Sequence, residues 1–213
     1  MKKLLLISAL FPLLLASCIK EDTYYVENYP DVITVYQGKF INDSGASFTV
    51  KENDTHVTSF TENQRYYMLC DILDRELNIR LKEIDPMLAL APLPASSDEE
   101  LPSDPVIFKA NRLTPYTLDL IFDIYKAKGS TYEHKILCRY EKGKDNILRI
   151  YLYHDGNNEH LGTMTADLLE TEHRFYTIDL RDFTCEGVTL TYYVQVKNAK
   201  GEYEIEKHTA SSY

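Results

Sequence analysis

The chain has no tryptophan, and only 8 of its 213 residues are glycine. It contains no GxSxG nucleophile motif, no HExxH zinc motif and no glycine-rich phosphate loop. Hydrolases of the GxSxG class, zinc proteases and P-loop enzymes carry these motifs because their chemistry depends on them. We therefore expect no catalytic residue, no metal site and no cofactor, and predict that the protein is not an enzyme.

The chain also lacks an excess of basic residues. It has 23 Lys and Arg against 33 Asp and Glu, and its formal net charge is -10. Proteins that bind nucleic acid need clustered cations to displace counterions from the phosphates. The charge therefore argues against a nucleic-acid partner and against peripheral binding to anionic lipid.

The N-terminus has no apolar run long enough to span a membrane. Met1-Lys2-Lys3 is followed by an apolar stretch, residues 4–15, that Ser8 and Pro12 interrupt. A charged start, a short apolar core and small residues describe a secretory signal peptide, residues 1–17. Because Cys18 follows Leu-Ala-Ser, the segment resembles a bacterial lipoprotein signal, which implies that Cys18 carries the acyl chains.

The residues after Cys18 indicate the cellular location more specifically. Lys20, Glu21 and Asp22 resemble the short export signal of surface lipoproteins in the Bacteroidetes. This resemblance implies a location on the outer leaflet of the outer membrane, with the body exposed at the cell surface. Residues 18–30 show no sustained periodicity and are predicted to form the lipidated tether.

Few cysteines remain once Cys18 is lipidated. Cys70, Cys138 and Cys185 are an odd number, so at most one bridge can form, and no CxxC or Cys/His metal spacing is present. Cys70 and Cys138 lie in apolar strand-like runs, where a free cysteine behaves as a small hydrophobic residue. We expect all three to be unpaired.

Alternating apolar and polar residues, together with 17 tyrosines, predict an all-β protein. In the first half, turn residues such as Asn42-Asp43-Ser44-Gly45 separate short strands. Four or five such strands within residues 31–91 predict a small, strongly bent barrel domain.

A change of composition follows the predicted barrel. Residues 92–105 are rich in proline, serine and acidic side chains, which predicts a linker. Residues 106–213 contain strand patterns at regular spacing and no amphipathic helix, which predicts a β-sandwich domain of about seven strands.

The order of an acylated cysteine, a small barrel and a sandwich, with the strand patterns of residues 116–122, 134–137, 148–154 and 175–180, resembles the NigD-like lipoproteins of Bacteroidales. That family has an OB-like N-terminal domain and a C-terminal β-sandwich, and the resemblance implies the same all-β architecture here. Asp155-Gly156-Asn157 departs from the family pattern after the second histidine. The resemblance implies no established activity.

His134 and His154 each lie at the end of a predicted strand, and could hold a metal with Asp155 if those strands are neighbours. The alternative is that each ring bonds to a loop carbonyl or faces water. Residues 155–159 resemble the start of a calcium loop, but position six is His160 and position twelve is Ala166, so a tight turn explains them equally well. The acidic pairs Asp119/Asp123 and Glu170/Glu172 are attributed to solvated strand faces.

These observations favour a non-enzymatic, surface-anchored lipoprotein that binds a macromolecular partner at the cell envelope. The alternative is a glycan-binding accessory module, in which Tyr151 and Tyr153, or Tyr192 and Tyr193, form the aromatic platform. An exposed, flat tyrosine face would favour a glycan, whereas an apolar patch or an open sheet edge would favour a protein.

Overall fold

The computed structural model describes residues 24–96, 101, 104–143, 147–183, 189–197, 200 and 202–211. Within these ranges the chain is built from strands and two short 3₁₀ helices, which confirms the all-β class. The chain divides into two compact units. The first comprises residues up to 63 together with 68–84, and the second comprises 64–67 and the residues from 85 onward.

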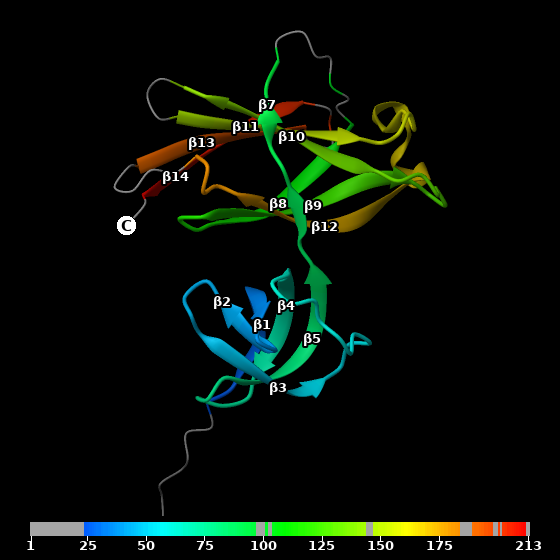
Figure 1. The fold of residues 1–213 in the computed structure, drawn as a ribbon. Helices are drawn as coiled ribbons and strands as arrows, with labels where there is room; N and C mark the ends of the chain where they lie inside the picture. Colours follow the sequence, from blue (N-terminus) through cyan, green and yellow to red (C-terminus); the bar gives the residue numbers. More distant parts are fainter. Residues whose placement is uncertain are drawn as a thin grey trace, which may run out of the picture. The chain divides into compact units, whose positions relative to one another are not determined.

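The first unit is built around a closed five-stranded barrel (Figure 1). Its strands follow one another around the barrel in the order β1-β2-β3-β5-β4. β1 pairs with β2 and β2 with β3 in antiparallel fashion, whereas β3 and β5 run parallel. This arrangement confirms the small barrel that the first half of the sequence predicts. The strands are β1 (Val26–Tyr36), β2 (Lys39–Asn42), β3 (Ser47–Asn53), β4 (Arg65–Ile72) and β5 (Asn78–Pro86).

The β2–β3 turn forms as its sequence predicts. The Asn42 side-chain oxygen accepts the amide protons of Ser44 and Ala46 at 3.1 and 2.9 Å. Gly45 has a φ of 83°, a left-handed conformation that glycine adopts at little cost. Strand β3 therefore returns in register, and Phe48 is buried directly opposite Phe40.

Strand β1 begins at Val26, so the predicted tether of residues 18–30 is too long at its C-terminal end. The reason is Asp71, which is almost fully buried. Its carboxylate accepts hydrogen bonds from the Tyr25 hydroxyl at 3.1 Å and the Asn28 amide at 2.9 Å, and pairs with Lys82 at 2.7 Å. These contacts hold the start of β1 on the barrel.

The second unit contains two sheets (Figure 1). The four-stranded sheet has the order β6-β12-β9-β8, with β6 (Leu88–Leu90), β8 (Val106–Leu113), β9 (Thr117–Ala127) and β12 (Leu169–Asp179). The five-stranded sheet has the order β14-β13-β11-β10-β7, with β7 (Leu93–Pro94), β10 (Lys135–Lys142), β11 (Ile147–Asp155), β13 (Thr189–Lys197) and β14 (Tyr203–Ser211). The 3₁₀ helices η1 (Leu161–Thr163) and η2 (Ala166–Leu168) lead into β12.

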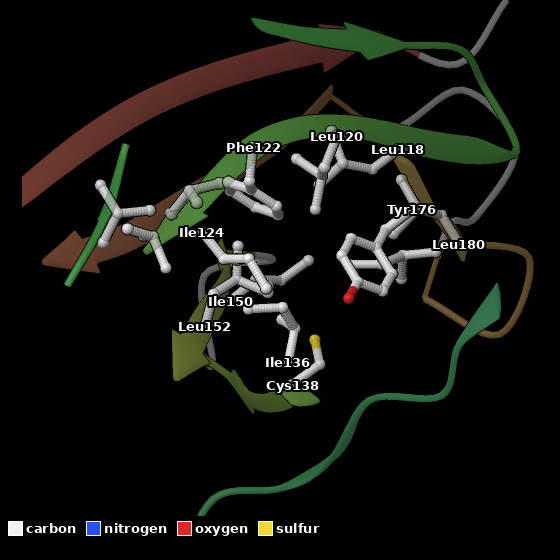
Figure 2. Close-up of a cluster of buried hydrophobic side chains, with 14 of the residues drawn as sticks. Leu118, Leu120, Phe122, Ile124, Ile136, Cys138, Ile150, Leu152, Tyr176 and Leu180 are labelled. Carbon is white, nitrogen blue, oxygen red and sulfur yellow. The ribbon is translucent and has the colours of Figure 1, made fainter. Parts of the chain in front are cut away.

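Side chains from both sheets meet in one hydrophobic core (Figure 2). Leu118, Leu120 and Phe122 of the four-stranded sheet are almost fully buried. They are in one cluster with Ile150 and Cys138 of the five-stranded sheet. Burial of a side chain of this size stabilises the fold by roughly 1.5–3 kcal/mol, so this cluster is the main force that holds the two sheets together.

Among the described residues, the range 106–213 contributes seven strands, β8 to β14, as the sequence predicts for the sandwich, and the two sheets contain nine strands in all. The additional strands are β6 and β7, which pair in parallel with β12 and β10. The sandwich unit therefore begins near residue 85, ahead of the proline-rich segment 92–105 that composition suggests as the boundary. Edge strands of two or three residues are too short to show periodicity, and an edge strand tolerates proline.

Cys70 and Cys138 are buried and unpaired, as expected for small hydrophobic residues. Burial raises the pKa of each thiol to about 12, so both stay protonated at neutral pH. Cys185 lies outside the described residues. Within the described ranges, no helix is long and apolar enough to cross a membrane.

Candidate functional site

The outward face of the five-stranded sheet carries an unusual set of side chains. Leu148, Ile150 and Leu152 of β11 belong to the core. Because successive residues of a strand point to opposite faces, Arg149, Tyr151 and Tyr153 lie on the outward face. The uninterrupted pairing of β10, β11, β13 and β14 extends this face across four strands. We call it the tyrosine face, and its tyrosines are Tyr151, Tyr153, Tyr193 and Tyr203.

Three of these tyrosines lie directly opposite a cation on a neighbouring strand. Arg139 is opposite Tyr151, and Lys197 is opposite Tyr203. Tyr193 lies between Arg149 of β11 and Lys207 of β14. The Arg149 guanidinium lies 5.7 Å from the centroid of the Tyr193 ring, and the Lys197 ammonium lies 5.7 Å from that of Tyr203. These are cation–π distances, which fix the rings and cations in one layer.

The tyrosine face is basic although the chain is acidic. Among its described residues, the cations outnumber the two carboxylates, Glu141 and Asp155. The Tyr151 hydroxyl donates a hydrogen bond of 3.1 Å to Glu141. Partial burial and this hydrogen bond raise the pKa of Tyr151, so its hydroxyl stays protonated and remains a donor. The cations are Lys135, Arg139, Arg149, Lys197 and Lys207.

Large apolar side chains are exposed at both edges of this sheet. On β14, Ile205 is 67% exposed and Tyr203 is 55% exposed. On β7, Leu93 is 53% exposed and lies opposite Arg139. Strand β14 is the last strand of the sheet among the described residues. Exposed apolar side chains on an edge strand are typical of binding surfaces, because monomeric proteins generally avoid them.

A second group of polar residues lies inside the sandwich, where the sequence places the two histidines. His154 is directly opposite Ile136, and His134 immediately precedes β10, so the strands are neighbours. His134 Nδ1 and His154 Nε2 are 3.0 Å apart, and His134 Nε2 is 3.1 Å from Glu159 Oε2. All three residues are buried.

The rest of the group consists of backbone contacts. His154 Nδ1 lies 3.0 Å from the Pro105 carbonyl oxygen. Glu159 Oε2 also accepts the Ala127 amide proton at 2.9 Å. Asp104 accepts the Gly156 amide proton at 2.9 Å, and its own amide donates to the His154 carbonyl, also at 2.9 Å. The histidines therefore connect segments that are distant in sequence.

The environment sets the charge of two members of this group. Burial lowers the pKa of His154, against the opposing effect of the Pro105 carbonyl. Burial alone would raise the pKa of Glu159. Hydrogen bonds from the Ser130 hydroxyl and the Ala127 amide, together with His134, outweigh burial and bring the pKa of Glu159 below its usual value. Glu159 is therefore a carboxylate and His154 a neutral imidazole at neutral pH.

The geometry of this group does not match either metal interpretation. The acidic neighbour of the histidines is Glu159, not Asp155, and the two rings point nitrogen to nitrogen. Glu159 faces His134, whereas a calcium loop would aim it at the loop centre. In the part of the chain that the structure describes, no group of three or more His, Cys, Asp or Glu residues could hold a metal ion.

The acidic pair Asp119/Asp123 corrects another expectation. Both residues are buried, at 2% and 5% exposure, and do not lie on a solvated strand face. Asp123 pairs with Lys109 at 2.8 Å and contacts the His173 ring. Glu170 is exposed and Glu172 partly exposed, as expected for a solvated face. Lys109, supplied by the neighbouring strand β8, allows Asp123 to be buried, and alternation alone does not show this.

Several residues singled out in the sequence lie outside the described residues. These include the side chain of Tyr192 and the anchor residues Cys18, Lys20, Glu21 and Asp22. Conversely, sequence reasoning missed the cations of the tyrosine face and the role of Glu159. Reading every second residue of residues 135–141 and 147–155 would have found Lys135, Arg139 and Arg149, because both runs alternate strictly.

Comparisons with known proteins identify solved structures that share this fold. No family model matches the chain, and no curated protein matches it. A NigD-like immunity protein from Bacteroides caccae is similar in structure, with a TM-score of 0.65 and 15% identity over 87% of this chain and 97% of that one. A protein of unknown function from Bacteroides vulgatus also has a TM-score of 0.65, with 13% identity over 88% and 91% of the chains.

A third solved structure, from Bacteroides fragilis, is provisionally named a lipoprotein. It has a TM-score of 0.58 and 13% identity, and covers 88% of this chain and 99% of that one. Identities this low establish the fold alone. The chain therefore has the fold of the NigD-like proteins of Bacteroides, which confirms at the level of architecture the resemblance carried by its strand patterns.

Proposed function

We propose that this protein is a non-enzymatic lipoprotein of the outer membrane that binds an acidic protein partner at the cell surface through its tyrosine face. Cys18 carries the lipid anchor, and Lys20, Glu21 and Asp22 direct export to the outer leaflet. The provisional lipoprotein name of the Bacteroides fragilis neighbour supports the anchor. The observation that carries the binding role is the layer of tyrosines and cations across β10, β11, β13 and β14.

The chemistry of this face favours a protein. Tyrosine and arginine are enriched at the energetic centres of protein interfaces, because each combines a large contact area with a polar group. The exposed Ile205 on the terminal strand β14 adds an apolar anchor. A partner with a strand or loop of acidic residues would meet the cations and this edge together.

A glycan requires bare aromatic faces on which a sugar ring can stack. The Arg149 guanidinium lies over the ring of Tyr193, and Lys197 lies over that of Tyr203. These contacts reduce the aromatic area available for stacking. Glycan binding is therefore the alternative, and one experiment separates the two.

The test uses the soluble body, residues 19–213, immobilised and exposed to fractionated envelope proteins and to a glycan array. Arg149→Glu removes the central cation, and Lys51→Glu, an exposed barrel residue, introduces the same change of charge elsewhere. We expect a protein ligand whose affinity falls about tenfold or more with Arg149→Glu and with increasing salt, and not with Lys51→Glu. Equal losses in both variants, or binding to glycans alone, would refute the proposal.

A further inference from the structure

The hydrogen bonds of the two buried histidines need more protons than two neutral imidazoles supply. Three hydrogen bonds lie end to end, joining the Pro105 carbonyl to His154, His154 to His134, and His134 to Glu159. The Pro105 carbonyl can only accept, and so can an ionised Glu159. Each of the three contacts needs one proton between its heavy atoms. Two neutral imidazoles bring only two, so the chain of contacts needs a third.

The position of the third proton follows from the neighbours. The Pro105 carbonyl fixes a proton on His154 Nδ1, which leaves His154 Nε2 as an acceptor and makes His134 Nδ1 the donor. His134 Nε2 then faces Glu159 Oε2, which already accepts the Ala127 amide proton. Glu159 is ionised because donors surround it. Because Glu159 Oε2 only accepts in these contacts, the third proton belongs on His134 Nε2.

We propose that His134, His154 and Glu159 form a buried site that binds a single excess proton, and that this proton latches three chain segments of the sandwich together. The segments are residues 104–105 before β8, residues 127–134 from the last residue of β9 to the start of β10, and residues 154–159 at the end of β11 and beyond it. Each contributes at least one partner of the linear array. The site is built from side chains that are 1% and 3% exposed at His134 and Glu159.

The site must hold one excess proton, because losing it and gaining a second proton each break a hydrogen bond. Without it, the lone pair of His134 Nε2 would face the Glu159 carboxylate. With a second proton, on His154 Nε2, two N–H groups would oppose one another across the 3.0 Å contact between the rings. Either change breaks a buried hydrogen bond and leaves a buried polar atom without its partner. The latch therefore holds only while the site carries this one proton.

Other charged groups of these segments also lie near the histidines. Asp104 and Asp155 are the carboxylates that act on His154, and both favour its protonated form. Lys128, Glu133, Lys135 and His160 lie in the same segments but are exposed to solvent. They are screened and contribute little to the proton affinity of a buried site.

The test combines nuclear magnetic resonance with amide exchange on the intact body. Long-range ¹H–¹⁵N spectra at neutral pH should show protons on both nitrogens of His134 and on Nδ1 alone of His154. Glu159→Gln removes the counter-charge, so His134 should lose its second proton, and the amides of Ala127 and Gly156 should exchange about tenfold faster. Glu133→Gln, an exposed neighbour, should match the wild type.

The wild-type spectrum alone is decisive, even if Glu159→Gln fails to fold. A singly protonated His134 ring at neutral pH would overturn the proposal. So would a doubly protonated His134 that persists in a folded Glu159→Gln variant, because the charge of Glu159 would then not hold the proton.

Discussion

At the scale of single residues, the tightest steric constraint that bears on the histidine latch is at Gly156. A methyl group there would lie 2.8 Å from Asp104 Oδ2 and 2.9 Å from Leu161 Cδ1, and Leu161 is fully buried. Asp104 also accepts the Gly156 amide proton. The absence of a side chain at position 156 is what allows residues 104 and 156 to approach.

We predict that Gly156→Ala lowers the free energy of unfolding of the sandwich by about 1–3 kcal/mol, because the methyl group overpacks a buried contact. Gly162→Ala is the matched control, since nothing lies within 4 Å of its added carbon. Urea unfolding of both variants measures the difference. Equal stability of the two variants would contradict the packing described here.

The buried thiols give a second prediction at this scale. Cys138 is 3% exposed and Cys70 is fully buried, and the pKa of each is about 12. A thiol probe at pH 7.5 should label neither residue in the folded protein and both after unfolding in urea. Peptide mass analysis identifies the labelled sites. Rapid labelling of Cys138 in the native state would show that the sandwich core is open.

At the scale of elements, the long strands were predictable and the short ones were not. Residues 148, 150 and 152 alternate with polar or aromatic neighbours, so both β11 and its buried face follow from the sequence. β6 and β7 have no periodicity, because they consist of three and two residues and depend on parallel pairing with distant strands. The start of β1 depends on Asp71, 43 residues from Asn28.

The candidate sites could likewise be predicted only in part from the sequence. Alternation predicts that Tyr151 and Tyr153 share a face, but not that β11 pairs in parallel with β13, which brings Tyr193 opposite Arg149. The approach of His134 and His154 follows if their strands are neighbours. The contact between His134 and Glu159 depends on the turn at Asn157 and Asn158, which both have left-handed backbone. Such a turn is set by its surroundings as much as by its sequence.

The latch gives a prediction for the acid stability of these elements. His154 has a pKa below its unfolded value of 6.5, so the folded state binds fewer protons than the unfolded state below that pH. Its stabilising contribution is therefore complete above about pH 6.5 and is lost as the pH falls, at up to about 1.4 kcal/mol per pH unit. Urea unfolding between pH 7 and 5 measures this slope.

His56, an exposed histidine of the barrel unit, provides the control for this measurement. Replacement of His154 by Gln should remove this share of the slope, whereas His56→Gln should leave it. A His154→Gln variant with the full wild-type slope would show that His154 does not titrate as described.

At the scale of the whole molecule, binding at the cell surface requires a lipid anchor and an outward orientation. Cys18→Ala should abolish acylation and detergent partitioning, because Cys18 is the residue that a lipoprotein signal of this kind acylates. Metabolic labelling with a palmitate analogue measures this. Full acylation of the variant would disprove the anchor.

Replacing Lys20, Glu21 and Asp22 together with Ala should leave acylation intact and abolish surface exposure. Added protease should remove the body from intact wild-type cells and spare it in the variant. If wild-type cells also resist protease until the outer membrane is broken, the body faces the periplasm, and the partner must be sought there.

The most direct test of the central claim is photo-crosslinking in living cells from two exposed tyrosines. A benzophenone amino acid at Tyr203 lies on the tyrosine face, and one at Tyr116, which is 63% exposed, lies in the turn before β9 on the other sheet. We predict a discrete protein adduct from position 203 that Arg149→Glu abolishes, and none from position 116. No adduct at 203, or the same adduct from both positions, would contradict the binding role of this face.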